Sequence, residues 1–200
     1  MANADTFLVS KSNFATTKLA PIDTSILTNV EAGEVLLKVD RFALTANNIT
    51  YAALGDKLQY WKFFPGEENF GVIPVWGFAE VLLSKCDGIE AGERFYGYYP
   101  MASHLKVLGK NISKYSFLDG APHRQGLAHI YNQYTRTAND PLYTQDSEAL
   151  QMLLRPLFTT SFLLDDFFNE NAFFNANTIV LTSASSKTAL GLAFLLNHNR

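Results

Sequence analysis

A short polar segment, residues 183–188, carries the side chains best suited to hold an anion. It follows an apolar run at 177–182, which we expect to be a buried strand, and precedes a helical pattern at 189–196. The first N–H groups of a helix lack partners and lie at the positive end of its dipole, so such a turn attracts phosphate. The candidate cofactor-binding residues are Ser183, Ser185, Ser186, Lys187 and Thr188.

Known nucleotide-binding motifs do not match this segment literally. A P-loop would need glycines at Leu181 and Ser186, so only Lys187 and Thr188 agree with that motif. The dinucleotide pattern G-x-G-x-x-G also fails, because Gly191 is the only glycine nearby. Two interpretations stay open at this point. The segment is either a phosphate site or a tightly packed turn whose hydroxyls cap the following helix.

The elements that would position this segment lie in residues 146–200. Residues 146–156 and 158–168 read as two helices, with Pro156 near the end of the first. Strand, tight turn and helix then follow in the order that opens a parallel α/β sheet. We therefore expect 146–200 to hold linking helices and the incomplete start of an α/β domain.

Residues 1–145 have a different character and read mostly as short strands and loops. Glycines and prolines interrupt the sequence at short spacing, which favours a barrel or a sandwich over a helical bundle. This part is expected to be a separate β-rich domain. Its strand-forming runs are at 34–44, 71–84, 94–99 and 103–108.

Composition excludes several classes of protein. The chain has 200 residues and a formal net charge of −3, which argues against a partner such as nucleic acid or an anionic membrane surface. A hydrophobic fraction of 48% provides ample material for a core. Cys86 is the single cysteine, so a disulfide scaffold and an all-cysteine zinc site are excluded within one chain. With no secretory signal pattern and no long apolar span, a cytoplasmic protein is expected.

Four stretches, taken in order, resemble the medium-chain dehydrogenase/reductase superfamily on its zinc-free, quinone-reductase-like side. Gly77-Phe-Ala-Glu-Val-Leu-Leu-Ser84 and Gly88-Ile-Glu-Ala-Gly-Glu-Arg-Phe-Tyr-Gly97 together look like its G-x-V-x-x-V and G-D-R-V-x-G signature. The other stretches are the strand and loop at 34–48, the strand at 102–107 and the strand and turn at 179–189. The run at 154–166 is similar to a branch of that superfamily known only as a domain of unknown function.

The resemblance implies an N-terminal barrel like the GroES fold, followed by the first βα units of a Rossmann domain. It also implies NADP or NAD as cofactor and reduction of an activated C=C or C=O in a small-molecule substrate. The family's zinc-dependent members place a cysteine and a Gly-His-Glu triplet where residues 45–48 and 72–74 stand here, so no metal is expected. By the same resemblance, the catalytic candidates are Thr45, Asn48 and Tyr51.

A second function is kept beside this one: a non-enzymatic binding or scaffold module. In the family pattern, Ser183, Ser186 and Ala189 stand where glycines would let the backbone approach a pyrophosphate. The residue that would read the ribose falls at or beyond Arg200, so the choice between NAD and NADP stays open. We expect that the chain is the N-terminal portion of a larger protein or that a partner completes its sheet. A hydrolase is set aside, because the chain has no G-x-S-x-G motif.

Three further groups of side chains have expected locations. Tyr96, Tyr98 and Tyr99 are expected to pack in the core rather than line a cleft. Arg124 and Arg136 are candidates to meet a substrate carboxylate, although the solvated surface is the expected location of both. The phenylalanines of 158–174 indicate an inter-domain surface or the interface of a homodimer.

Overall fold

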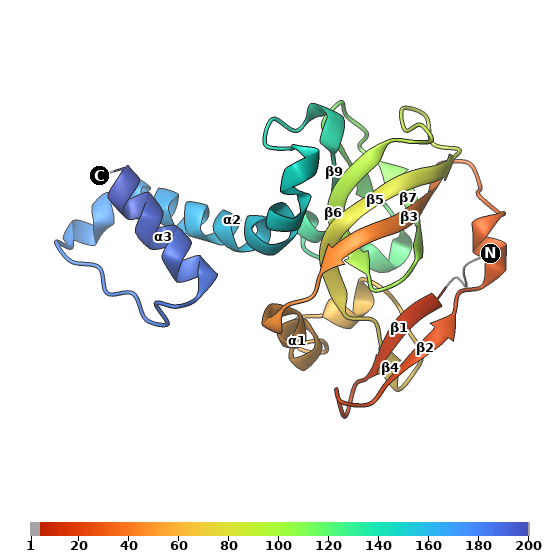
Figure 1. Cartoon of the computed structure of the whole chain (residues 1–200), viewed down its shortest axis with the longest axis horizontal. Coiled ribbons are helices and arrows are strands. Elements are labelled where there is room, and N and C mark those ends of the chain that lie inside the picture. The colour runs from red at the N-terminus through yellow and green to blue at the C-terminus, as the bar shows by residue number, and fades with distance from the viewer. Residues whose placement is uncertain (1–4, 200) are drawn as a thin grey trace. The chain divides into compact units, whose positions relative to one another are not determined.

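The structure is a computed structural model that describes residues 5–199. The described residues form two compact units that divide between Gln145 and Asp146. The first unit is built mostly of β-strands and the second of α-helices (Figure 1).

A closed antiparallel barrel forms most of the first unit, with strand order β3-β5-β6-β9-β8-β7. Two β-bulges shift the register between β3 and β5: the extra residue is Leu82 of β5 at the first and Asp40 of β3 at the second. Such bulges increase the bend and twist that barrel closure requires. The barrel strands are β3 (Glu34–Ala43), β5 (Pro74–Ser84), β6 (Arg94–Pro100), β7 (His104–Lys110), β8 (Ser116–Asp119) and β9 (Gln133–Arg136).

The core fills this barrel and explains its strand sequences. Residues 35–37 of β3 and 95–100 of β6 are buried at successive positions, because these stretches are covered on both faces. Tyr96, Tyr98 and Tyr99 are at most 5% exposed, which confirms that they pack in the core. The mostly β barrel is confirmed, and the four predicted runs correspond to β3, β5, β6 and β7.

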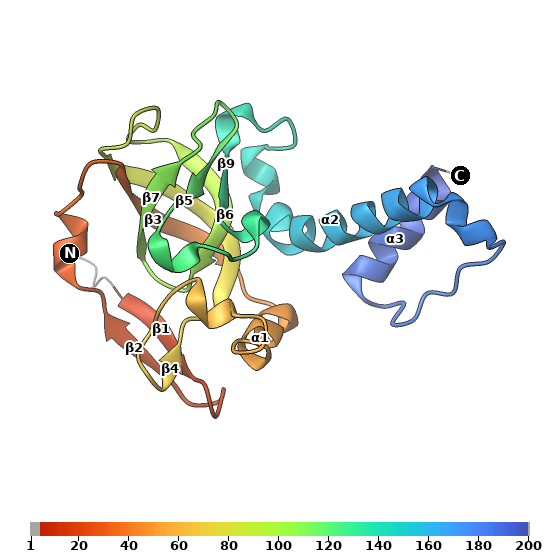
Figure 2. The ribbon, with the colours of Figure 1, turned by 180° about the vertical axis from the view of Figure 1, so that it is seen from behind.

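A small sheet of order β2-β1-β4 lies beside the barrel in both views (Figures 1 and 2). It joins β1 (Asp5–Ser10), β2 (Thr17–Pro21) and the two-residue β4 (Phe70–Gly71). One helix, α1 (Ala46–Ala53), follows β3 directly. Short 3-10 helices occupy the connections, at Thr24–Leu27, Tyr60–Lys62, Pro122–Arg124, His129–Tyr131 and Thr137–Asn139.

The second unit contains two packed helices, α2 (Glu148–Glu170) and α3 (Lys187–His198), preceded and joined by 3-10 turns at Gln145–Ser147 and Ala172–Asn175. Gly191 of α3 lies against Ser161 of α2, where an added Cβ would come within 2.7 Å of the serine oxygen. The Ser161 hydroxyl also donates to the Thr188 carbonyl over 2.8 Å. These contacts hold the two helices side by side, as both views show (Figures 1 and 2).

Two predictions about this unit are wrong. α2 is one helix and does not end near Pro156. Proline removes one helical N–H, at a cost of about 3 kcal/mol, and buried residues before and after it keep the helix continuous. The predicted strand at 177–182 is an irregular segment. A strand needs a hydrogen-bonded neighbour, and the second unit contains no other strand within the described range, so Val180 is left 82% exposed.

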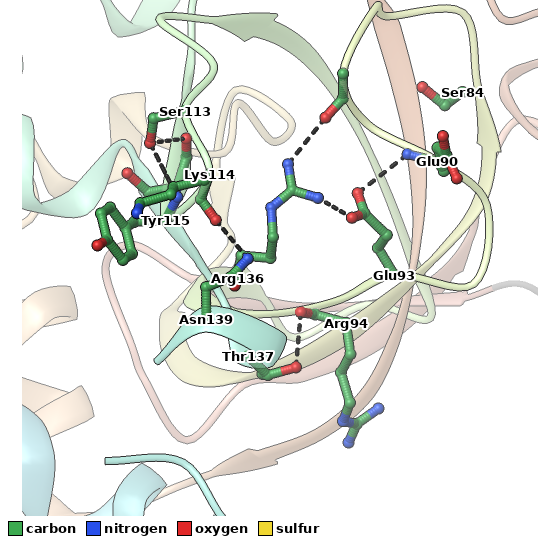
Figure 3. A network of polar contacts seen from close by, with 12 residues as sticks. Ser84, Glu90, Glu93, Arg94, Ser113, Lys114, Tyr115, Arg136, Thr137 and Asn139 are labelled. Carbon is green, nitrogen blue, oxygen red and sulfur yellow. Dashed lines mark hydrogen bonds and ion pairs between the residues drawn. The ribbon is translucent and has the colours of Figure 1, made fainter. Parts of the chain in front are cut away.

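The two arginines expected at the surface are buried, which corrects that prediction. The Arg136 guanidinium pairs with Glu93 and donates to the Gly88 carbonyl over 2.9 Å (Figure 3). Arg124 is only 2% exposed and forms an ion pair with Asp119 at 2.9 Å. Arg124 lies in the turn between β8 and β9, and Arg136 ends β9. These two strands have only four residues each, so the sequence gives little indication of them.

Candidate functional site

An aromatic cluster surrounds Tyr51, the last of the predicted catalytic residues. The Tyr51 ring centroid lies 4.7 Å from that of Tyr60, 5.5 Å from Tyr98 and 6.4 Å from Tyr131. Trp76 of β5 packs against Tyr98 at 5.1 Å and against Tyr131 at 5.9 Å. We call these five residues the Tyr51 cluster. They come from α1, β5, β6 and two 3-10 turns, so only the folded first unit brings them together.

The polar atoms of this cluster are incompletely paired. The Tyr98 hydroxyl and the Trp76 indole N–H are buried and have no hydrogen-bond partner of normal geometry in residues 5–199. Burial raises the pKa of Tyr51, and polar interactions with Trp76 and Tyr98 partly counteract that rise. Burial raises the pKa values of Tyr98 and Tyr131 even further. All three phenols therefore stay protonated at neutral pH and can donate hydrogen bonds.

Asn48 positions Tyr51 and is not itself free for catalysis. Its side-chain oxygen accepts from the Thr45 backbone N–H over 2.7 Å and from the Thr45 hydroxyl over 3.2 Å. Its amide nitrogen donates to the Pro74 carbonyl over 2.9 Å, and the residue is 3% exposed. Asn48 thus caps α1 and ties it to β5. Thr45 and Asn48 are brought together at the start of the helix that carries Tyr51.

Close packing of Trp61 fixes the segment that carries Tyr60. An added Cβ on either Gly55 or Gly71 would collide with the Trp61 ring. The glycines therefore allow Trp61 to become 92% buried between two parts of the backbone, with only 8% exposed. Tyr60 is the neighbour of this anchor, and its ring is held against Tyr51 and Tyr131.

The predicted cofactor-binding residues lie in the second unit, around the start of α3. Ser186 is the N-cap of that helix, and its hydroxyl accepts from the Ala189 N–H over 3.1 Å. Ser183, Ser185 and Lys187 are exposed. The Thr188 carbonyl accepts from Ser161. The capping interpretation thus accounts for Ser186, and the strand that should precede a dinucleotide turn is not formed.

Two negative findings apply to the described part of the chain. Residues 5–199 contain no group of three or more His, Cys, Asp or Glu side chains arranged to hold a metal ion. Within the same residues, no helix combines the length and the hydrophobicity needed to cross a bilayer.

Sequence reasoning missed the other members of the cluster as site residues. No local sequence pattern connects Tyr60, Trp76 and Tyr131, because these residues lie far apart in the chain. Tyr98 was correctly placed in the core, yet its unpaired hydroxyl depends on neighbours that only the fold supplies. The single available signal was the aromatic content of 14%.

Comparison with solved structures finds enoyl reductases among the similar chains. One is the apo crystal structure of JamJ enoyl reductase, which is 12% identical with a TM-score of 0.48 and is matched over 98% of this chain and 51% of that chain. Another is the mitochondrial 2-enoyl thioester reductase Etr1p/Etr2p heterodimer from Candida tropicalis, 14% identical with a TM-score of 0.46, over 96% and 50%. The chain thus spans about half the length of these two structures.

No curated protein matches the chain. A family model described as "Protein of unknown function (DUF2855)" matches residues 42–200. This range includes α1, most of the barrel and the whole second unit. Since the match extends over more than half of the sequence, the chain belongs to the DUF2855 family of proteins of unknown function.

Proposed function

We propose that the chain is the carbonyl-binding part of a zinc-free oxidoreductase-like protein that reduces an activated C=C or C=O in a small molecule. The observation that carries this proposal is the pair of buried, unmatched donors beside Tyr51, namely Trp76 and Tyr98. The motif resemblance to medium-chain reductases supports the reaction class.

Hydrogen bonds from the two donors would orient the O–H bond of Tyr51. A phenol oxygen can accept hydrogen bonds through its lone pairs and donate through its single proton. When Trp76 and Tyr98 donate to the Tyr51 oxygen, its proton is left for an acceptor outside the cluster. Such contacts are often long before a ligand binds and shorten in the complex. A substrate carbonyl oxygen, which becomes more negative during reduction, is the acceptor that this donor favours.

A nicotinamide nucleotide would supply the hydride for such a reduction. The described start of α3 does not fit the phosphates of a dinucleotide as a Rossmann turn does, since the strand is absent and the Ser186 hydroxyl is already used. Lys187 and the exposed Ser183 and Ser185 remain candidates for direct phosphate contact. We therefore propose NADP or NAD as the cofactor, without a choice between the two.

The test measures the oxidation of NADPH or NADH by cyclohexenone in the presence of the protein, monitored as the loss of absorbance of the reduced nucleotide. We expect turnover by the wild-type protein and a loss of about 10²-fold or more in Tyr51→Phe, the size typical of removing a donor to a developing oxyanion. Lys187→Ala should weaken nucleotide binding. Equal rates for wild type and Tyr51→Phe, or unchanged nucleotide affinity in Lys187→Ala, would contradict the respective assignment.

The start of α3 favours a second candidate, a binding module without catalysis. Its specific observation is the Ser186 hydroxyl, which caps the helix and does not face a ligand. This candidate predicts that neither NADPH nor NADH raises the melting temperature at saturation. A melting-temperature rise with either nucleotide would exclude it.

A further inference from the structure

A cleft lined by Tyr60 and Tyr131 opens where residues 57–63 face residues 126–131. Its volume is about 370 Å³, within the range of roughly 300–1,000 Å³ that small-molecule sites occupy. The cleft lies wholly in the first unit. Its apolar walls include Leu58, Phe63 and Leu127.

Two half-buried tyrosine rings, Tyr60 and Tyr131, line the cleft and pack on the buried Phe63. Phe63 is 2% exposed, and its ring centroid lies 6.3 Å from that of Tyr60 and 5.4 Å from that of Tyr131. Tyr60 and Tyr131 are themselves 5.9 Å apart in an edge-to-face arrangement. Rings in such positions accept another planar group by stacking or edge contact.

The polar groups of the cleft favour a negative charge. Lys57 lines it and makes no hydrogen bond or ion pair with any other described residue. None of its lining residues is acidic. The phenols of Tyr60 and Tyr131 add neutral donors, and burial together with the Tyr60 hydroxyl raises the pKa of Tyr131. An ammonium ion and two phenols at the edge of an apolar cleft match a carboxylate on a planar body.

We infer that the cleft between residues 57–63 and 126–131 is a binding site for a small aromatic carboxylate, with its ring against Tyr60 and Tyr131 and its charge at Lys57. This inference goes beyond the proposed reductase, because it requires neither a nicotinamide nucleotide nor a reaction.

The experiment is calorimetric titration of the 200-residue protein with naphthoate, and with methyl naphthyl ketone as its neutral counterpart. Naphthoate should bind saturably and more tightly than the ketone. Lys57→Met should weaken naphthoate about three- to tenfold, as expected for loss of one charge-assisted contact, and leave the ketone unchanged. Ala128→Trp, at an exposed position on the cleft wall, should weaken both ligands more than tenfold by filling the space.

Lys114→Met is the matched control, since it removes the same charge at an exposed site outside the cleft. Circular dichroism and the unfolding midpoint verify that each variant is folded. The inference is overturned if naphthoate does not bind saturably, if Ala128→Trp leaves binding unchanged, or if Lys57→Met has no more effect than Lys114→Met. A protein that binds naphthoate but never oxidises NADPH supports this site and refutes the reductase.

Discussion

Two buried polar groups in the first unit differ in how their hydrogen bonds are completed. Around Arg124, the two Nη atoms donate to the Tyr131 carbonyl, Asn132 and the Tyr134 hydroxyl, while Nε is ion-paired with Asp119 without a hydrogen bond of normal geometry. In the Tyr51 cluster, the donors of Trp76 and Tyr98 lack such acceptors among residues 5–199. The Tyr98 residue belongs to both groups, because its backbone carbonyl accepts from Tyr134 while its own hydroxyl is unmatched.

The two groups thus differ in how many of their buried donors are paired. A buried donor without an acceptor costs about 1–3 kcal/mol, so a fold retains one most readily where a ligand supplies the acceptor. The Arg124 group stabilises the barrel at β8 and β9, and Phe64 stacks on it with the guanidinium 4.6 Å above its ring. The Tyr51 cluster keeps its hydrogen-bonding capacity available.

Asp119→Ala should have the largest effect on stability. It leaves the Arg124 charge buried without its carboxylate, which typically costs about 3–5 kcal/mol. It also removes the acceptor for the Leu108 and Ala121 backbone N–H groups. Urea unfolding measures the loss. A change below about 1 kcal/mol would show that the pair does not stabilise the barrel.

Tyr134→Phe and Tyr98→Phe form a matched pair, since each removes one buried hydroxyl. Tyr134→Phe should cost about 1–3 kcal/mol, because Arg124 and the Tyr98 carbonyl lose a partner. Tyr98→Phe should change stability by less than about 0.5 kcal/mol or increase it, because its hydroxyl makes no hydrogen bond of normal geometry in the unliganded protein. Equal losses in the two variants, measured by urea unfolding, would remove the distinction between the two groups.

Asn48→Ala should cost about 1–2 kcal/mol through loss of the cap on α1 and of the bond to Pro74. Because Asn48 positions Tyr51 without contacting substrate, the variant should raise the KM for cyclohexenone and lower kcat less than Tyr51→Phe does. A Tyr51→Phe-like loss in kcat with unchanged stability would instead make Asn48 a catalytic residue.

Asp40→Asn should have a small, pH-dependent effect on stability. A hydrogen bond from Arg94 holds the pKa of Asp40 below its usual value. The stabilisation is therefore present above the unfolded carboxyl pKa of about 3.9 and disappears as pH falls through the lower folded value. The Asp40–Arg94 ion pair is partly exposed, so solvent screening limits its contribution to stability to less than about 1 kcal/mol. Unfolding midpoints of wild type and variant should differ near neutral pH and converge in acid.

The parts of the fold that follow from local sequence were predictable. The runs that became β3, β5, β6 and β7 have strand-forming residues, and α3 has a continuous apolar pattern. β8 and β9 have only four residues each, and their pairing depends on distant partners. The strand at 177–182 failed for the same reason, because an apolar run becomes a strand only beside another strand.

Of the five residues in the Tyr51 cluster, the sequence points to Tyr51 alone as a catalytic candidate, and that role stays a prediction. Its place after the first core strand came from the family resemblance, and the fold puts it among four other aromatic residues. The role of Asn48 could not be read from sequence, because its amide bonds to Pro74, twenty-six positions away. Burial of Arg124 likewise depends on an acceptor set that the barrel assembles.

The most direct test of the central claim is the infrared carbonyl stretch of carbon-13-labelled cyclohexenone bound to the protein. If Trp76 and Tyr98 donate to the Tyr51 oxygen and the Tyr51 hydroxyl donates to the carbonyl oxygen, the carbonyl stretch should have a lower frequency in the wild-type complex than in free cyclohexenone. The shift should be smaller in Tyr98→Phe and absent in Tyr51→Phe, while all three proteins remain folded. An identical stretch in wild type and Tyr51→Phe would contradict the claim that this cluster receives a carbonyl oxygen.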